Sequence, residues 1–460
     1  MRFRDLEDVK RFESLTDEIS RFSSRGIRPG LRRITGLLRA LGEPQKEIRS
    51  IQVLGTNGKG SVAAAIEAIL LAGGMKTALY TSPHLISLQE RLRIGGRYLS
   101  VGDWRSSWER VRNAVTGDAE LDSDRPSFFE HITAICVLSM RDAAVDIAVM
   151  EAGMGGRYDA TSVCDASAAV INPIGMDHTQ YLGTTLEAIA REKFAAVRNG
   201  GYAFYAGDDE SLVPLFIEEC RASGAAAYLL DDMARPKDVV CTLDGAVFTY
   251  EPREGFAGAA EIPLLETPLL GKHQAFNAAR AITVLLSLKD KLPGMSFIGA
   301  DVIRRGLKRT DWPGRLELFR REGAPSVILD GAHNEHAARA LISSIFSLKK
   351  SSEKGDKIKI GAVVLAMMAD KDIPRVLRVI KDIECPVYCT EIPMERSAAA
   401  MDLRGMAIEA GMKTGGYFHD PSEALEAASK AVAPNEFVLC CGSLFLVGNL
   451  KRTLETDSTS

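Results

Sequence analysis

The chain has 460 residues, which is too long for one compact core and predicts two or three domains. Apolar residues make up 46% of it and charged residues 26%, proportions typical of a soluble globular protein. The 57 basic and 61 acidic residues leave a net charge of −4, so nothing favours nucleic acid or an anionic membrane as the main partner.

The N-terminus and the cysteines both favour a cytoplasmic protein. Residues 1–8 carry charges of both signs and no long apolar run follows them, so we expect no secretory signal. No stretch of about 18 apolar residues occurs, so we expect no membrane span. The eight cysteines lack metal-ligand spacing, and free thiols fit a reducing compartment.

In chain order, the first fifty residues predict helices joined by a basic turn that contains Arg28, Pro29 and Gly30. A short apolar strand at 51–54 then leads into a glycine-rich loop, and a helix rich in alanine and leucine follows. A second strand at 77–80 completes a strand-loop-helix-strand unit. This order predicts a parallel sheet flanked by helices.

Further along, apolar segments extend this sheet and then begin a second one. Between about 226 and 263, short apolar segments alternate with turns, which predicts a small antiparallel patch attached to the main sheet. A linker is expected around 310–315, after which alternation of strand and helix restarts over about 150 residues, a typical domain size. The strands expected in the two sheets, besides those above, lie at 145–150, 168–171, 202–205, 326–329, 358–365, 387–390 and 437–441.

The loop after the first strand reads Gly55-Thr56-Asn57-Gly58-Lys59-Gly60-Ser61. Backbone N–H groups of such a turn can converge on phosphate oxygens, and the helix that follows adds its dipole. The spacing differs from a Walker A loop, because only two residues precede Gly-Lys and Gly60 separates the lysine from Ser61. A generic glycine turn is the alternative, but the strand, the helix and the central lysine favour ATP, with Lys59 bridging its β- and γ-phosphates.

Polar residues also follow the neighbouring strands. Glu151 comes directly after the strand at 145–150, at the edge of a parallel sheet where ligands usually bind. A carboxylate there is a good magnesium ligand, and a surface or helix-capping glutamate is the alternative. His178 follows the strand at 168–171 and Lys193 lies on a helix; each alone is more often structural or solvated.

Taken together, these clusters resemble the Mur ligase superfamily, and within it the branch of folylpolyglutamate and dihydrofolate synthases. The resemblance covers residues from about 25 to 450. Its motifs occur in order as Gly55 to Ser61, Thr81-Ser82-Pro83-His84-Leu85, Glu90-Arg91, Glu151-Ala152-Gly153-Met154-Gly155-Gly156-Arg157, Asp159-Ala160-Thr161, Asp177-His178-Thr179, Glu192-Lys193, Gly271-Lys272-His273-Gln274, Pro313-Gly314-Arg315 and Leu329-Asp330-Gly331-Ala332-His333-Asn334.

The resemblance implies an α/β fold with two domains. Residues 1–311 would form an ATP- and folate-binding domain of the P-loop ATPase type, with a mostly parallel sheet and the antiparallel patch. Residues 312–460 would form a Rossmann-like glutamate ligase domain. The implied activity is ATP-dependent ligation of L-glutamate to dihydropteroate and to the γ-carboxylate of tetrahydrofolate through an acyl phosphate.

The resemblance also implies roles for single residues around the phosphate loop. Besides ATP, it implies two magnesium sites, with Ser82, Glu151 and His178 as ligands. Lys193 matches a lysine that family members carry as a carbamate, an anion that could orient the second metal ion. Nucleotide contacts are implied for Asn277, Arg315 and Asp330, and His333 would assist catalysis at the same place.

The acceptor site is implied by three short segments. The first is Arg28, Pro29 and Gly30, and the second is Ser127, Phe128, Phe129 and Glu130. The third is Tyr158, Asp159 and Ala160. Phe128 and Phe129 could stack on a pterin ring, or they could be ordinary core aromatics of a helix, and the sequence leaves both open.

Other functions remain open on the sequence. The chain could be a folylpolyglutamate synthase only, or another Mur-type amino-acid ligase such as one that acts on a UDP-muramyl precursor. It could also be a protein that binds ATP as a conformational switch without turnover. We expect a cytoplasmic monomer whose partners are ATP, L-glutamate and dihydropteroate or a reduced folate, with no nucleic acid and no membrane.

Overall fold

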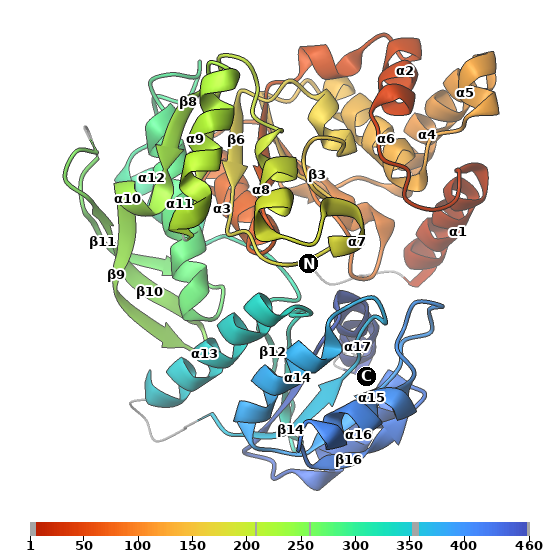
Figure 1. Ribbon diagram of the computed structural model, residues 1–460, viewed down its shortest axis with the longest axis vertical. Coiled ribbons are helices and arrows are strands. Elements are labelled where there is room, and N and C mark those ends of the chain that lie inside the picture. Colours follow the sequence, from red (N-terminus) through yellow and green to blue (C-terminus); the bar gives the residue numbers. More distant parts are fainter. Residues whose placement is uncertain (1–5, 208, 257–258, 352–357, 458–460) are drawn as a thin grey trace. The chain divides into compact units, whose positions relative to one another are not determined.

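The structure is a computed structural model that describes residues 6–207, 209–256, 259–351 and 358–457 (Figure 1). By compactness the chain divides into two units. The first comprises Met1–Arg235, Glu251–Glu261 and Asn277–Arg309, and the second comprises Pro236–Tyr250, Ile262–Phe276 and Thr310–Ser460. The predicted boundary at residues 311 and 312 stays a prediction about where the functions divide.

The first unit is built on an eight-stranded sheet with the strand order β4-β3-β2-β5-β1-β6-β7-β8. Neighbouring strands from β2 to β8 run parallel, and the β3–β4 hairpin adds antiparallel strands at one edge. The strands are β1 (Ser50–Leu54), β2 (Thr77–Tyr80), β3 (Leu92–Ile94), β4 (Arg97–Tyr98), β5 (Ile147–Glu151), β6 (Ala168–Ile171), β7 (Tyr202–Tyr205) and β8 (Ala226–Leu229).

Two apolar clusters bury this sheet. One packs residues of β2 and β5 against helices α1, α2, α4 and α6, which Figure 1 shows gathered on one part of the unit. The other packs β6 and β7 against α8 and α9. The helices are α1 (Leu6–Phe22), α2 (Arg32–Ala40), α3 (Lys59–Ala72), α4 (Val101–Thr116), α5 (Ala119–Ser123), α6 (Phe128–Asp142), α7 (Thr179–Leu182), α8 (Leu186–Phe194), α9 (Val213–Ala222), α10 (Leu230–Met233), α11 (Lys272–Leu288) and α12 (Ala300–Leu307). The first residues of α11, up to Phe276, count with the second unit.

The antiparallel patch exists, but its predicted attachment to the main sheet is wrong. It is a separate three-stranded sheet in the order β11-β10-β9, formed by β9 (Ala234–Thr242), β10 (Gly245–Pro252) and β11 (Ile262–Thr267). Cys241 and Ala246 of this sheet belong to the apolar core of the second unit. Burial of these side chains explains why the patch goes with that unit, although the chain enters it from the first.

The second unit holds a six-stranded sheet in the order β12-β13-β17-β14-β15-β16, parallel except for β12 at one edge. It is the α/β unit expected from the sequence. Its elements are β12 (Glu317–Phe319), β13 (Ser326–Leu329), α13 (Glu335–Ser351), β14 (Ile360–Leu365), α14 (Ile373–Ile380), β15 (Val387–Thr390), α15 (Ala400–Glu409), β16 (Thr414–Phe418), α16 (Pro421–Ala431), β17 (Phe437–Cys441) and α17 (Leu444–Asp457).

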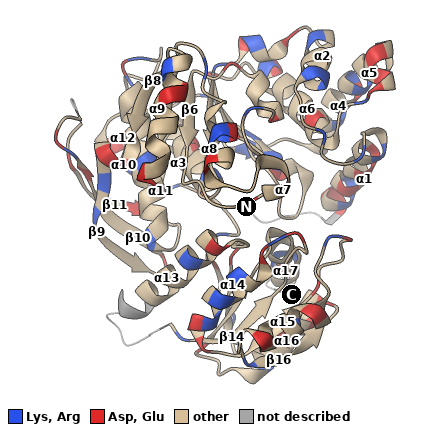
Figure 2. Cartoon of the chain, viewed as in Figure 1, with Lys and Arg blue, Asp and Glu red and all other residues tan. Residues whose placement is uncertain are grey.

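Charge is spread over both units. Figure 2 shows both basic and acidic residues among the helices of each unit, although single helices such as the basic α2 and the acidic α5 carry one sign. No helix in the described part of the chain combines the length and apolar composition that crossing a bilayer would need.

Candidate active site

Four neighbouring strands deliver the chemistry-bearing residues of the first unit to one edge of the sheet. β2, β5, β1 and β6 are adjacent and parallel, so their carboxyl ends lie together. Ser82 follows β2, Glu151 ends β5, the phosphate loop follows β1, and His178 follows β6. Residues about 120 positions apart in the sequence therefore meet where parallel sheets usually bind ligands.

The phosphate loop is a tight turn that requires its glycines. Gly55 and Gly58 have φ angles of 127° and 81°, which side chains other than glycine rarely adopt. A Cβ on Gly55 would lie 2.7 Å from Asn172 Cβ, and one on Gly58 would lie 2.9 Å from Asn277 Oδ1. Helix α3 begins at Lys59, so the loop's N–H groups and the positive end of the helix dipole face the same place. The loop fits a nucleotide phosphate.

Contacts on both sides fix the loop's position. The Thr56 amide donates to Pro173 O at 2.9 Å, and the Thr56 hydroxyl bonds to the backbone of Gly175 at 3.0 Å. Lys59 Nζ donates to Gly55 O at 3.2 Å and to Thr56 O at 3.1 Å, so the ammonium lies over the loop itself. Asn277, for which a nucleotide contact is predicted, has its side-chain amide beside Gly58 of the loop.

Ser82 and Glu151 form the part of the predicted metal site that the structure defines best. Ser82 N donates to Glu151 Oε2 at 3.2 Å. The Ser82 hydroxyl is buried and has no hydrogen-bond partner among the described residues, a costly arrangement unless a ligand completes it. A hydroxyl oxygen beside a carboxylate is a donor set that suits magnesium.

The described residues contain no group of three or more histidine, cysteine, aspartate or glutamate side chains arranged to hold a metal ion. Magnesium commonly relies on one or two carboxylates and takes its other ligands from water and substrate phosphates. His178 is on the same sheet edge, in a left-handed conformation (φ 51°) at the start of α7. The residues therefore fit a magnesium ion held jointly with a nucleotide.

Lys193 is buried beside the phosphate loop. It lies in the last turn of α8 with 4% of its surface exposed, and its Nζ donates to Gly55 O at 2.9 Å. Burial, with a smaller contribution from the charge of Lys59, lowers the pKa of Lys193 to about 7. The sequence left open whether this lysine was an ordinary solvated one, and the structure excludes that interpretation.

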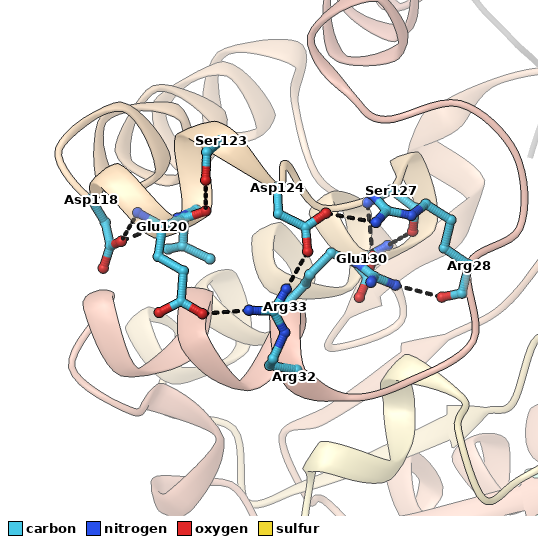
Figure 3. Close-up of polar contacts among 10 residues, drawn as sticks. Arg28, Arg32, Arg33, Asp118, Glu120, Ser123, Asp124, Ser127 and Glu130 are labelled. Atoms are coloured by element: carbon cyan, nitrogen blue, oxygen red, sulfur yellow. Dashed lines mark hydrogen bonds and ion pairs between the residues drawn. The ribbon is translucent and has the colours of Figure 1, made fainter.

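The first two acceptor segments are joined by charged side chains (Figure 3). Arg28 pairs with Asp124 at 2.6 Å, and Arg32 reaches both Asp124 and Glu120. Arg33 pairs with Glu130 at 3.2 Å; both are almost fully buried. The first pairs fasten the turn around Arg28 to α5 and its C-terminal end, while Arg33, which also donates to Arg28 O, links that turn to the first turn of α6.

The second and third acceptor segments meet at Gly153. A Cβ on Gly153 would lie 2.7 Å from the Phe129 ring and 3.3 Å from Asp159 Oδ2, so the glycine makes room for both. Asp159 is buried and accepts from the Met154 amide at 2.8 Å and the Thr161 hydroxyl at 2.6 Å. Phe128 and Phe129 are only partly buried and pack against the core cluster. All three predicted segments are therefore neighbours in space, while their contact with an acceptor stays a prediction.

The second unit gathers its own three predicted residues. Asp330, at the end of β13, accepts from the amides of Leu316 at 2.9 Å and Ala332 at 2.8 Å. Burial raises the pKa of Asp330, and the charge of Arg315 partly offsets this. His333 Nδ1 bonds to Gly331 O at 2.8 Å, and a Cβ on Gly331 would meet the Arg315 guanidinium at 2.4 Å. Arg315, Asp330 and His333 thus surround one glycine turn.

Sequence reasoning missed two buried polar residues near the loop. Gln52 on β1 bonds to Thr161 and Ser162, and a polar residue in an apolar strand was the signal that could have revealed it. Asn172 is fully buried at the end of β6 against Gly55, and neither end of its side-chain amide has a hydrogen-bond partner among the described residues. No spacing in the sequence indicated Asn172.

Comparisons with known proteins agree with this geometry. Residues 53–285 match the Mur ligase middle domain, and residues 314–444 match the Mur ligase glutamate ligase domain. The chain is 30% identical to the dihydrofolate synthase/folylpolyglutamate synthase of Bacillus subtilis, over 94% of this chain and 96% of that protein. It is also 30% identical to the folylpolyglutamate synthase of Lacticaseibacillus casei, over 92% and 94% of the two chains.

Two solved structures show the same fold with ligands. FolC of Escherichia coli in complex with DHPP and ADP aligns with a TM-score of 0.81 and 27% identity, over 97% of this chain and 98% of that one. The Yersinia pestis bifunctional folylpolyglutamate synthase/dihydrofolate synthase, complexed with AMPPNP and a manganese ion, aligns with a TM-score of 0.79 and 28% identity, over 96% and 98%.

The fold and the two family matches define an ATP-dependent, amide-forming ligase. The chain belongs to the Mur ligase family, and within it to the dihydrofolate synthase/folylpolyglutamate synthase group. The resemblance seen in the sequence motifs is confirmed, and so is the expected α/β fold.

Proposed function

We propose that this chain joins L-glutamate to dihydropteroate, and to the γ-carboxylate of a reduced folate, at the expense of ATP. One observation carries the proposal. A single sheet edge brings together a phosphate loop, a buried serine hydroxyl beside a carboxylate, and the glycine turn at Gly153 on which the acceptor segments meet. Relatives that this chain matches over nearly their whole length carry both activities in their names.

The chemistry follows from the substrates. A carboxylate is a poor electrophile, so its oxygen first attacks the γ-phosphorus of ATP and ADP leaves. The glutamate amine then attacks the carbonyl carbon of the acyl phosphate and loses a proton. The C–O bond to the phosphate breaks, and inorganic phosphate leaves. Both steps depend on charge neutralisation and alignment, which this site supplies.

The residues of the first unit divide this work. The loop amides and Lys59 hold the β- and γ-phosphates, and Asn277 supports the loop at Gly58. Ser82, Glu151 and His178 hold magnesium, which when bound neutralises phosphate charge. For Arg315, Asp330 and His333, which lie in the second unit, the family resemblance implies nucleotide contact and help with the transfer.

Lys193 is proposed to act as a carbamate. Formation of a carbamate requires the neutral amine, and a pKa of about 7 makes that form abundant at neutral pH. Addition of carbon dioxide to Nζ, with loss of a proton, converts a buried amine into an anion beside the loop. That anion would orient a second magnesium ion.

The acceptor is proposed to lie against Phe128 and Phe129, with the turn at Arg28 on one side and the turn at Asp159 on the other. The edge of the Phe129 ring lies against Gly153, and the side chain is only partly buried, which supports its contact with a pterin ring. We further propose a cytoplasmic monomer. The location is supported by eight cysteines that are all free thiols.

A direct assay tests the function. Purified protein is incubated with ATP, magnesium and glutamate, and with either dihydropteroate or tetrahydrofolate, and both ADP release and the glutamylated product are measured. We expect turnover with each acceptor. Absence of ADP release with both acceptors would refute the proposal.

The second candidate is a folylpolyglutamate synthase without dihydrofolate synthase activity. It is favoured by the L. casei relative, which is 30% identical and named for that activity alone. Turnover with tetrahydrofolate but none with dihydropteroate would support it. A UDP-muramyl substrate serves as a further control, since turnover with it alone would assign the chain to the cell-wall ligases.

A further inference from the structure

Gln52 is a polar residue at the centre of the main sheet. It lies on β1, the strand that leads into the phosphate loop, between the apolar residues Ile51 and Val53. Only 1% of its surface is exposed. A buried amide is costly unless it is hydrogen-bonded. Gln52 Nε2 donates to Thr161 Oγ1 at 2.7 Å and to Ser162 Oγ at 2.9 Å, while Oε1 has no hydrogen-bond partner among the described residues.

The direction of each bond is fixed by the groups beyond. The Thr161 hydroxyl donates to Asp159 Oδ1 at 2.6 Å, and the Ser162 hydroxyl donates to Gly156 O at 2.6 Å. Each hydroxyl has one hydrogen, so each can only accept from Gln52. The side-chain amide is therefore oriented with its NH2 group toward both hydroxyls, and it supplies two donors at one point.

Two branches leave Gln52. One runs through Thr161 to Asp159, whose other oxygen holds the Met154 amide at 2.8 Å next to Gly153 and Phe129. The other runs through Ser162 to Gly156, where a Cβ would lie 2.8 Å from the carbonyl oxygens of Glu192 and Lys193. The first branch reaches Gly153 and Phe129 in the proposed acceptor site, and the second reaches the backbone of Lys193.

We propose that Gln52 is a positioning residue. It fixes the turn Asp159–Ser162 to β1, the strand that leads into the phosphate loop. Through that turn it also fixes the proposed acceptor site at Gly153 and the backbone of Lys193. The proposal rests on the ligase function stated above. The hydrogen bonds of the Gln52 side chain go to Thr161 and Ser162, neither of which is assigned to the nucleotide. Acceptor binding should therefore depend on it, and ATP binding should not.

Two substitutions, each at a different residue of the hydrogen-bond network, test the proposal. Gln52→Met keeps the length of the side chain but removes both donors, and Thr161→Val keeps the shape of the threonine but removes its hydroxyl. For each variant we expect the KM for dihydropteroate or tetrahydrofolate to rise about tenfold, with the KM for ATP within about twofold of the wild type. Because Gln52→Met already cuts the branch through Thr161, the double variant should lose little more than Gln52→Met alone.

Ser50→Ala is the matched control. Ser50 lies on β1 two positions before Gln52, so it is on the same face, and its hydroxyl is buried without a hydrogen-bond partner among the described residues. Its removal should leave both KM values unchanged. Equal losses in both KM values, or additive losses in the double variant, would overturn the proposal in favour of a merely structural role.

A readout without turnover separates this inference from the proposed function. Hydrogen exchange of the amides at 154–162 should accelerate in Gln52→Met, while the amides of α3 keep their protection. If wild-type protein showed no turnover with either folate acceptor, the function would fail, and this exchange pattern would still decide the role of Gln52. Unchanged exchange at 154–162 would refute it.

Discussion

At the scale of single residues, Lys193 is the side chain whose chemistry depends most on its surroundings. An ordinary lysine, with a pKa near 10.5, has fewer than about one in a thousand amines neutral at pH 7. Burial lowers the pKa to about 7, so roughly half of the amines are neutral at that pH. The neutral fraction rises as the pH increases through 7 and falls below it.

We therefore expect bicarbonate to increase turnover, and carbamate occupancy to rise from pH 6 to pH 8. The carbamate carbon can be observed by NMR after incubation with ¹³C-labelled bicarbonate. Lys193→Ala should abolish both the signal and the turnover, and Lys193→Arg, which stays cationic, should do the same. Full activity at pH 8 in buffer freed of carbon dioxide, without a carbamate signal, would contradict the carbamate.

Glu151 offers a second test at this scale. Glu151→Gln keeps the size of the side chain and an acceptor for the Ser82 amide but removes the charge that attracts magnesium. Changes to groups that only support a ligand weaken metal binding by about 10- to 100-fold, so we expect at least about a tenfold rise in the magnesium concentration for half-maximal turnover.

A magnesium titration of activity measures this change. The control is Glu187→Gln, an exposed glutamate in the first turn of α8, which should titrate like the wild type. Identical magnesium dependence in Glu151→Gln and the control would remove Glu151 from the metal site.

At the scale of elements, the helices α4 and α6 both begin with a serine N-cap. Ser127 starts α6 and Ser100 starts α4, and each forms a capping box with the acidic residue three positions later. Replacing either serine with alanine should lower the free energy of unfolding by about 1 kcal/mol, because helix N–H groups lose their acceptor.

Only one of the two capping serines lies in a predicted acceptor segment, so enzyme kinetics should distinguish the two variants. Ser127 lies in the acceptor segment beside Glu130, whereas Ser100 is the matched control on α4. Ser127→Ala should raise the KM for the folate acceptor, and Ser100→Ala should leave it unchanged. Thermal unfolding and steady-state kinetics on both variants make the comparison. Equal KM values would show that the cap only stabilises its helix.

Gly156 and Gly405 differ in how much room the structure leaves for a Cβ atom. A Cβ on Gly156 would lie 2.8 Å from two backbone carbonyl oxygens, so Gly156→Ala must push α8 away. A displacement of about 1 Å near reacting groups can cost about 100-fold in rate, and we expect a loss of that order. Gly405, exposed within α15, has open space around it, so Gly405→Ala should keep full activity and stabilise the protein by about 0.5 to 1 kcal/mol.

Regular strands were predictable from the sequence, and irregular ones were not. The strands at 77–80, 168–171, 202–205, 326–329, 387–390 and 437–441 occur as predicted, because short apolar runs between turns are typical of buried parallel strands. The β3–β4 hairpin, β12 and β16 were missed, and β8 was wrongly placed in the antiparallel patch although it pairs in parallel with β7. β4 has two residues, two of the four residues of β8 are exposed alanines, and β16 contains Gly415 and Gly416, so none carries a strong local pattern.

At the scale of the whole molecule, ligand binding and stability are linked. A nonhydrolysable ATP analogue with magnesium, at about 100 times its Kd, should add about 2.7 kcal/mol to the stability of the unit that binds it. We expect the corresponding unfolding transition to rise by roughly 5 °C or more in calorimetry. Lys59→Met, which removes the ammonium over the loop, should show a smaller rise, and an equal rise would exclude Lys59 from phosphate binding.

The overall plan of the molecule could be read from the sequence, but two of its features could not. The order of motifs indicated the family, two α/β units and the residues around Gly55, Glu151 and Lys193. The allocation of the β9–β11 sheet to the second core depends on Cys241 and Ala246 packing with residues about 100 positions away. The Gln52 network depends on two hydroxyls more than 100 residues along the chain, and no local pattern records such contacts.

The order of the strands also governs how the protein is made. β1 is the first strand of the sheet to leave the ribosome, but its two partners, β5 and β6, begin only at Ile147 and Ala168. Until then β1 has no strand partners, and the phosphate loop lacks the supports that Asn172 and Pro173 provide. We therefore expect nucleotide to stabilise a nascent chain only after about 170 residues have left the ribosome.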